Sequence, residues 1–203
     1  MRVLVTGASG QVGHALLACQ PQGIECLAPT SHELDLSEPQ QISQLLSQWR
    51  PELIINAAAY TAVDRAESDP ERAFAINASA VEHLSAAAGA IGARLFQLST
   101  DYVFAGGTGA PLTEDAPCKP LNVYGTSKLA GEQAALALGE QALVLRTSWV
   151  FGVHGNNFVK TMLRIGAERD ALTIVADQIG GPTGAAEIAR ACVAIAKTLA
   201  SEP

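Results

Sequence analysis

The sequence predicts an α/β fold in which a doubly wound parallel sheet carries helices on both faces. Short apolar segments alternate with longer segments that carry apolar residues at helical spacing. The short segments are apolar throughout, as strands buried on both faces are. A glycine-rich turn also follows the first of them. The expected strands are 2–7, 23–28, 52–59, 93–100 and 142–151, and the expected helices between them are 11–20, 38–50, 69–90 and 121–138.

Sequence signals for helix starts accompany two of these helices. Ser37 precedes Glu38 and Pro39, with Gln40 three places after Ser37, which predicts a capping box with proline in the first turn. The segment "SDPERA" at 68–73 repeats the pattern. The two helices are therefore expected to begin close to Ser37 and within 68–73.

The regular alternation of strand and helix patterns ends after residue 151. We expect residues 1–150 to form a dinucleotide-binding core and residues 151–203 to begin a small, incomplete substrate lobe with a returning helix. "GVHGNNF" (152–158) and "DQIGGPTG" (177–184) are typical of loops. Within 151–203 we expect helices at 158–168 and 185–200 and a short strand at 172–175, "LTIV".

Composition excludes several classes of function. The 203 residues carry a net charge of −7 with scattered Lys and Arg, so no nucleic-acid partner is expected. No apolar run approaches the roughly 18 to 20 residues that span a bilayer, and the N-terminus lacks the order of a signal peptide, so we expect a cytoplasmic protein without membrane contact. The four cysteines and four histidines show no metal-ligand spacing, and no metal site is predicted.

The glycine turn "VTGASGQVG" predicts a dinucleotide site. Glycines at three-residue spacing between a strand and a helix allow a tight turn and close approach of a pyrophosphate to the free N–H groups of the helix N-terminus. The candidate contacts are Gly7, Gly10, Gln11, Val12 and Gly13. A strand-to-helix context makes this motif specific.

The end of the second strand bears on the choice of cofactor. An acidic residue is usual there for holding the ribose hydroxyls, but Pro29 is followed by the neutral hydroxyls Thr30 and Ser31. These neither clamp a 2′-hydroxyl as a carboxylate does nor repel a 2′-phosphate, so the preference stays open, with NADPH favoured and NADH also allowed. Asp35 and Leu36 are expected beside the adenine ring, unless Asp35 is a solvated loop residue.

The third long strand ends in small residues. Ala57, Ala58 and Ala59 let the backbone approach a ligand at the carboxyl end of a central strand, with Tyr60 beside them. Simple core packing is the alternative.

Tyr124 and Lys128 lie one helical turn apart. A phenol with a pKa near 10 is a poor acid or base unless a neighbouring cation stabilises the phenolate, which Lys128 is placed to do. A hydroxyl that orients the substrate oxygen is offered by Ser99 or Thr100, at the carboxyl end of the fourth strand. Together with the glycine turn, the three side-chain types predict a hydroxyl, tyrosine and lysine triad at the rim where the cofactor should lie.

These motifs resemble those of extended short-chain dehydrogenase/reductases with a Rossmann core. More narrowly, they resemble the dTDP-4-dehydrorhamnose reductase family across the whole chain. The phrases that carry the resemblance are "NAAAYTAVDRAE", "STDYVF", "PLNVYGTSKLAGE", "RTSWVFG", "GNNFVKTMLR" and "DQIGGPTGA".

The resemblance implies residue roles. Thr100 orients the substrate, Tyr124 protonates the C4 oxygen, and Lys128 lowers the pKa of that phenol and holds the nicotinamide ribose. Thr100 takes this role in preference to Ser99. The implied reaction transfers a hydride from NADPH or NADH to the C4 ketone of dTDP-4-dehydro-L-rhamnose. The resemblance places Thr100, Asp101, Tyr102, Tyr124, Trp149, Asn156 and Asn157 at the sugar nucleotide, and Trp149 is equally compatible with a core position.

The sequence also departs from this family. Its members continue beyond the position of Pro203 through a C-terminal lobe, so either a fragment or a short natural protein is expected. A non-catalytic NADP(H)-binding regulatory subunit of the methionine adenosyltransferase type and a nucleotide-sugar epimerase or dehydratase are the alternatives. A homodimer is an expectation, and a divalent metal at a subunit interface is left undetermined.

Overall fold

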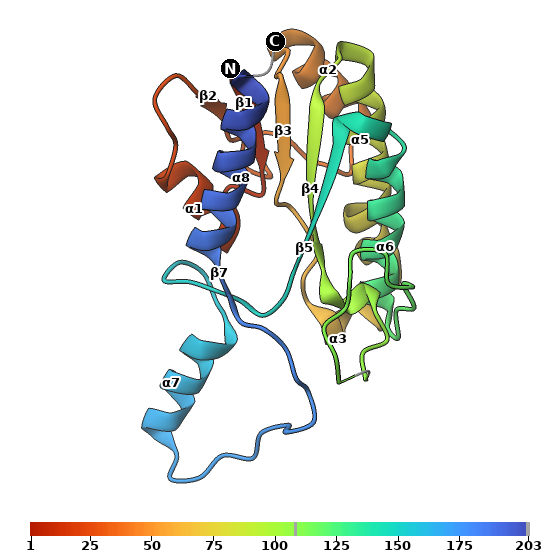
Figure 1. The fold of residues 1–203 in the computed structure, drawn as a ribbon. Coiled ribbons are helices and arrows are strands. Elements are labelled where there is room, and N and C mark those ends of the chain that lie inside the picture. The colour runs from red at the N-terminus through yellow and green to blue at the C-terminus, as the bar shows by residue number, and fades with distance from the viewer. Residues whose placement is uncertain (108, 202–203) are drawn as a thin grey trace.

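A computed structural model describes residues 1–107 and 109–201 of the protein. Its centre is a five-stranded sheet in the order β2-β1-β3-β4-β5, with every pair of neighbours parallel (Figure 1). The strands are β1 (Arg2–Thr6), β2 (Glu25–Leu27), β3 (Leu53–Asn56), β4 (Arg94–Thr100) and β5 (Ala142–Thr147). The predicted α/β fold with a parallel sheet is confirmed.

The two faces of the sheet bury alternate residues of each strand. Leu4, Ile54 and Leu95 point into one apolar cluster, whereas Val5 and Ile55 point into the other. The first cluster is covered by α2 (Pro39–Trp49), α5 (Ala80–Ile91) and α6 (Val123–Leu136), and the second by α1 (Gln11–Ala18) and α8 (Ala185–Ser201), as Figure 1 shows. This two-sided burial explains why the strands are apolar throughout.

The predicted helix 69–90 is interrupted. After α3 (Val63–Ala66), the chain forms α4 (Pro70–Phe74), a π-helical turn at Ala75–Ser79 and then α5. Asn77 in this turn is buried, and its side chain bonds both the N–H and the carbonyl of Tyr60 and the Oγ of Ser127 in α6. A Cβ on Gly131 would lie 2.0 Å from the Asn77 carbonyl oxygen, so the turn and α6 are in close contact. Such turns are frequent at functional sites.

The predicted capping box at Ser37 is wrong. Helix α2 begins at Pro39 as expected, but its N-cap is Glu38, and no side chain caps it. The Oγ of Ser37 instead donates to the Asp35 carboxylate, because this oxygen is only two residues away. The N-cap of α4 likewise lacks a side-chain hydrogen bond.

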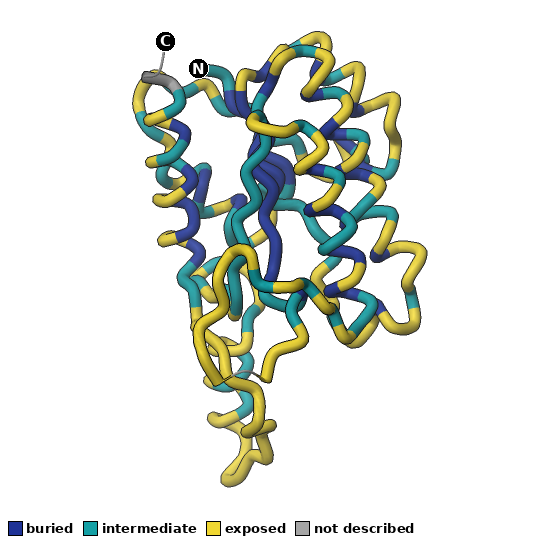
Figure 2. Tube along the Cα trace, turned by 45° about the vertical axis from the view of Figure 1, so that its right-hand side comes forward, coloured by how far each residue is buried: buried dark blue, intermediate teal, exposed yellow. Residues whose placement is uncertain are grey.

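The strand that the sequence predicted at 172–175 does not form. Residues 172–175 are exposed and pair with no other strand, because a β-prone run needs a neighbouring edge to become a strand. Instead β6 (Val150–Phe151) pairs with β7 (Thr183–Gly184), and α7 (Phe158–Glu168) lies between them in sequence. Trp149 has a φ of 48°, which ends β5 before β6 begins. Figure 2 shows this segment as a largely exposed extension of the core.

Helix α8 belongs to the packed core. Ile188, Ala189 and Cys192 join the cluster beneath α1, so the chain returns to the sheet after the exposed segment. Within residues 1–107 and 109–201, no helix combines the length and apolar character needed to cross a membrane.

Candidate active site

A cleft of about 600 Å³ lies at the carboxyl ends of the strands. Its walls come from segments that follow each of the five strands, which is where open α/β sheets bind ligands. A volume of this size is typical of a cofactor site. The residues that were predicted from the sequence and line it are Gly7, Gly10, Gln11, Val12, Thr30, Ser31, Asp35, Leu36, Ala57, Ala58, Ala59, Tyr124, Lys128 and Asn156.

The glycine turn has the geometry that a diphosphate needs. Gly7 has a φ of 70°, and a Cβ there would lie 2.5 Å from the Ala58 nitrogen. Gly10 is the N-cap of α1 and supplies no side chain, so the first N–H groups of the helix face the cleft. The segment after β1 and the segment after β3 are thus in backbone contact, and only glycine fits between them.

Gly13 does not line the cleft, but it allows α1 to pack closely against the glycine turn. A Cβ on Gly13 would lie 2.2 Å from the Gly7 carbonyl oxygen and 2.7 Å from the Ala8 Cα. Helix α1 can therefore approach the turn only because residue 13 lacks a side chain.

We expect Gly13→Ala to lower the free energy of unfolding by about 1 to 3 kcal/mol, because both clashing partners are backbone atoms that cannot move independently. Gly166→Ala in α7 is the matched control, since no atom lies within 4 Å of its Cβ position and alanine favours helix by up to about 1 kcal/mol. Urea unfolding of both variants measures the difference. Equal stability for Gly13→Ala and the wild type would contradict the packing described.

The turn after β2 holds two carboxylates, those of Glu33 and Asp35, in local hydrogen bonds. The Glu33 carboxylate accepts hydrogen bonds from the N–H and the hydroxyl of Thr30, at 2.8 and 2.9 Å, which lowers the pKa of Glu33. Asp35 accepts from Ser37, and its pKa is also lowered. Arg72 of α4 also lines the cleft and adds a cation close enough to act on Asp35.

Tyr60 lies apart from the cleft lining, unlike the prediction. Its hydroxyl donates to Asp69 at 3.2 Å, and its backbone is held by Asn77. The tyrosine therefore belongs to the contact between the end of β3 and the π-helical turn.

Tyr124 is buried at the start of α6. Asn122 caps this helix by accepting from the Gly125 N–H at 2.7 Å, which places Tyr124 in the first turn. Burial raises the pKa of the Tyr124 phenol to about 12, and the hydrogen bond between Tyr124 and Thr100 opposes that shift. The net shift is opposite to the predicted lowering of the pKa by Lys128, because desolvation outweighs the favourable contacts. The phenol is consequently protonated at neutral pH.

Lys128 is buried one turn after Tyr124. Its ammonium donates to the Leu98 carbonyl at 2.7 Å. Burial lowers the pKa of Lys128 to about 8, and the charge of Glu132 opposes the shift. The group is therefore a cation below about pH 8 that is held at the edge of the cleft.

A chain of buried hydrogen bonds leads across the sheet to the same carbonyl. Thr6 donates to Asn56 at 2.5 Å, Asn56 donates to Gln97 at 2.7 Å, and Gln97 donates to the Leu98 carbonyl at 2.8 Å. In the sequence these three side chains stand at ordinary positions of the expected strands. Their only sequence signal was the amide residues within otherwise apolar strands, and such groups must be paired when buried.

Thr100 links the strand end to Tyr124. Its hydroxyl accepts from the Tyr102 N–H at 3.2 Å, and it lies against both Asp101 and Tyr124. The Tyr102 ring packs edge-on against the Tyr124 ring, with centroids 5.4 Å apart. Burial raises the pKa of Asp101. Ser99, the other candidate hydroxyl, lines the cleft with a buried Oγ that has no hydrogen-bond partner among the described residues.

Only some of the residues that were expected at the sugar nucleotide line the cleft. Asn156 lines the cleft, but the Asn157 side chain caps α7 and donates to Gln11 at 3.0 Å. Trp149 is exposed and packs edge-on against Phe158, so its alternative assignment to the core is wrong. Gln11 in turn donates to the Val150 carbonyl at 3.3 Å, which ties the glycine turn to the segment after β5.

Further lining residues escaped sequence analysis. Several stand inside the motifs quoted above but were not singled out there: Thr6, Ala8, Ser9, Pro29, Leu34, Thr61, Ile76, Leu98, Thr147, Val150 and Gly155. Across the described part of the chain, no group of three or more His, Cys, Asp or Glu side chains is arranged to hold a metal ion.

Comparison with known proteins gives one consistent family. The model of the RmlD substrate binding domain matches residues 1–203. The dTDP-4-dehydrorhamnose reductase of Aggregatibacter actinomycetemcomitans is 44% identical over 98% of this chain and 68% of its own length. The Escherichia coli protein of the same name is 46% identical over 96% of this chain and 66% of its length. The chain thus spans about two thirds of these relatives.

Solved structures agree with the sequence matches. A dTDP-4-dehydrorhamnose reductase from Clostridium acetobutylicum superposes with a TM-score of 0.94 at 37% identity, over 98% of this chain and 71% of that one. A Bacillus anthracis protein of the same name, in complex with NADP, gives 0.91 at 40% identity, over 96% and 70%. A Thermus thermophilus UDP-glucose 4-epimerase with NAD, at 23% identity and a TM-score of 0.80 over 96% and 74%, shares the fold.

Proposed function

This chain belongs to the dTDP-4-dehydrorhamnose reductase family, and we propose that it reduces the C4 ketone of dTDP-4-dehydro-L-rhamnose with a hydride from NADPH or NADH. The observation that carries the proposal is the position of Tyr124. A protonated, buried phenol lies beside Thr100 and one turn from Lys128, at the edge of a cleft that begins at the glycine turn.

The chain supplies the proton while the cofactor supplies the hydride. As the C4 carbon becomes tetrahedral, its oxygen gains negative charge and takes the proton of Tyr124. Thr100 orients that oxygen by hydrogen bonding. The raised pKa of Tyr124 supports this direction of transfer, because a phenol that is protonated at neutral pH is ready to act as an acid.

Binding of the dinucleotide is assigned to the remaining lining residues. Gly7 and Gly10 receive the diphosphate at the N-terminus of α1, and Lys128 receives the nicotinamide ribose with its buried ammonium. The same ammonium favours the negative charge that develops on Tyr124 after proton loss. The alanines after β3 leave room for the dinucleotide backbone.

The turn after β2 sets the preference between the two cofactors. Glu33 places a carboxylate on Thr30, where a 2′-phosphate would approach, whereas Arg72 offers a compensating cation. We expect Glu33→Gln to lower the dissociation constant of NADPH severalfold, because the amide keeps an acceptor for Thr30 and removes the charge. The constant for NADH should stay within about twofold. Titration by nicotinamide fluorescence measures both, and equal changes for the two cofactors would contradict the assignment.

We propose that residues 1–150 with helix α8 form the dinucleotide-binding core and that residues 151–184 begin the substrate lobe. The cleft residue Asn156 of this lobe and the exposed Trp149 just before it are sugar-nucleotide contacts, together with Asp101 and Tyr102 after β4. The Asn157 side chain acts through its bonds to α7 and Gln11.

The function is tested with the purified 203-residue chain. NADPH and NADH are titrated in turn, and dTDP-4-dehydro-L-rhamnose is then added while the absorbance of the reduced nicotinamide is followed. Cofactor binding followed by oxidation supports the reductase. Tight binding without oxidation, together with capture of a partner enzyme, favours the regulatory-subunit alternative.

A cytoplasmic location and a homodimer are part of the same proposal. A cytoplasmic enzyme has direct access to reduced nicotinamide and nucleotide sugars. Light scattering tests the homodimer, which requires twice the chain mass of 21.1 kDa.

A further inference from the structure

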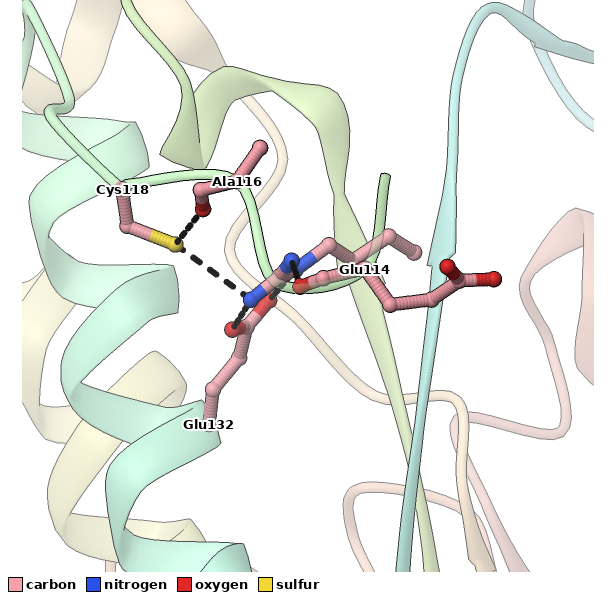
Figure 3. A network of polar contacts seen from close by, with 5 residues as sticks. Glu114, Ala116, Cys118 and Glu132 are labelled. Carbon is pink, nitrogen blue, oxygen red and sulfur yellow. Dashed lines mark hydrogen bonds and ion pairs between the residues drawn. The ribbon is translucent and has the colours of Figure 1, made fainter. Parts of the chain in front are cut away.

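Arg146 of β5 joins three separate segments beside the site. Its guanidinium makes two bonds to the Glu132 carboxylate of α6, at 2.9 Å from Nε and 2.7 Å from Nη2. It also donates to the Glu114 carbonyl at 3.1 Å and to the Cys118 sulfur at 3.3 Å. Figure 3 shows these groups converging from α6 and from the loop that precedes it.

The loop held by Arg146 connects the two halves of the catalytic set. It leaves β4 just after Thr100 and ends at the Asn122 cap, directly before Tyr124. The Phe104 ring, near its start, packs under the guanidinium with 4.9 Å from the carbon to the ring centroid. Arg146 therefore contacts the loop near its beginning, at Glu114 and at Cys118.

Glu132 is the buried end of this arrangement. Its side chain is 2% exposed and lies one helical turn beyond Lys128, whereas that of Arg146 is 23% exposed. An unpaired carboxylate at this depth would be costly, and the two-bond contact with Arg146 offsets that cost. The carboxylate is thus fixed in position relative to the lysine on the same helix face.

We propose that Glu132 and Arg146 form a positioning pair for the catalytic residues. Arg146 holds Phe104, Glu114 and Cys118 of the segment after β4 close to α6, and Glu132 provides a fixed negative charge one helical turn from Lys128. The inference rests on the proposed function for its catalytic consequence, but the holding of the loop is independent of turnover. Neither residue lines the cleft, so both act through Thr100, Tyr124 and Lys128.

Several charged or titratable groups lie on α6 and on the elements packed against it. On α6 these are Tyr124 and Glu132, and the sheet contributes Arg146 from β5. The segment after β4 contributes Asp101 and Tyr102. Of these, Glu132 is the group that raises the pKa of Lys128 against the effect of burial. The two members of the pair should therefore shift the ionisation of Lys128 in opposite directions.

The loop is tested through the reactivity of Cys118, which is half-buried against Arg146. Arg146→Gln should raise its alkylation rate by iodoacetamide at least about tenfold, because the rate follows the population of the open loop. The alkylation rate of the double variant Cys118→Ala, Arg146→Gln gives the contribution of the other cysteines, which is subtracted. Arg190→Gln, which removes an exposed pair with Glu187, is the matched control and should leave the rate unchanged. An unchanged rate in Arg146→Gln would overturn the holding role.

The charge effect is tested by the pH dependence of kcat/KM. The alkaline limb of this profile should report the ionisation of Lys128. Glu132→Gln should lower the pKa of the limb by about half a pH unit to one pH unit, and Arg146→Gln should raise it. Glu132→Gln should also reduce kcat about tenfold through misplacement, with the dissociation constant of NADPH within about threefold. If the two residues are purely structural, the pKa of the alkaline limb should stay unchanged in both variants or move in the same direction in both. Either result would overturn the charge effect. A wild type that binds NADPH but shows no turnover would refute the proposed function, and the Cys118 measurement would still decide the loop.

If Arg146→Gln fails to fold, Glu132→Gln carries both tests. This variant keeps the guanidinium and a neutral acceptor in place of the carboxylate. It should still lower the pKa of the alkaline limb, and it should raise the Cys118 alkylation rate severalfold over the wild type. Absence of both changes would overturn the proposal.

Discussion

Tyr124→Phe is expected to lower kcat for ketone reduction by about 10² to 10⁴-fold, because a positioned general acid contributes that much. The phenylalanine ring keeps the edge-on contact with Tyr102 and the packing of the first turn of α6. It removes only the hydroxyl that bonds Thr100 and that would protonate the substrate. Initial rates at saturating cofactor and substrate measure the loss.

The same variant should bind NADPH with a dissociation constant within about threefold of the wild type, since only one hydroxyl is removed from a long cleft. Its thermal unfolding should also stay close to that of the wild type. Turnover equal to the wild type would remove the phenol from the mechanism. A large loss of cofactor affinity would instead assign Tyr124 to binding.

Lys128→Met is expected to give the second largest effect. Turnover should fall by about 10²-fold, and the dissociation constant of NADPH should rise about tenfold, because a charge-assisted hydrogen bond is lost. The thioether fills much of the same space, and the Leu98 carbonyl keeps its bond from Gln97. Fluorescence titration and initial rates separate the two effects. A variant with full turnover would contradict the role of the ammonium.

Lys128 also gives a pH dependence of stability with a defined sign. Its pKa is lowered from 10.5 to about 8 by burial, so between these values the unfolded chain binds a proton that the folded chain has released. The free energy of unfolding should therefore rise with pH across this window, by up to about 1.4 kcal/mol per unit from this group. Below about pH 8 the folded state bears the full cost of the buried ammonium.

Comparison with Lys128→Met isolates that contribution. The variant lacks the group, so the stability difference between wild type and variant should shift in favour of the wild type from pH 8 to 10. Urea unfolding at several pH values in this range measures the difference. A constant difference would contradict the lowered pKa.

The sequence predicted those parts of the site that rest on local patterns. Gly7 and Gly13 follow a strand and open a helix, and Tyr124 and Lys128 share a helix face, so spacing alone placed them. The order of alternating strands and helices predicted the sheet for the same reason. Apolar runs buried on both faces leave few other arrangements.

The parts that were missed depend on contacts between distant segments. The pairing of Arg146 with Glu132 joins β5 to α6, and the bonds of Asn77 join the end of β3, the π-helical turn and α6. Neither pairing leaves a periodic signal in the sequence. The strand expected at 172–175 was wrong because no neighbouring edge lies beside it.

The predicted direction of the Tyr124 pKa was wrong for a related reason. The nearby lysine is evident from the spacing, but the depth of the phenol is not, and desolvation proved to be the larger effect. The same burial lowers the pKa of Lys128. Both shifts therefore come from the packing of α6 on the sheet.

Transfer of deuterium from labelled NADPH tests the central claim most directly. The 203-residue chain is incubated with NADPH deuterated at the transferable C4 position and with dTDP-4-dehydro-L-rhamnose, and the sugar product is analysed by mass spectrometry and NMR. We predict dTDP-L-rhamnose with one deuterium at its C4 carbon, formed at least about 10²-fold more slowly by Tyr124→Phe. Bound cofactor with no labelled product from the wild type would contradict the account.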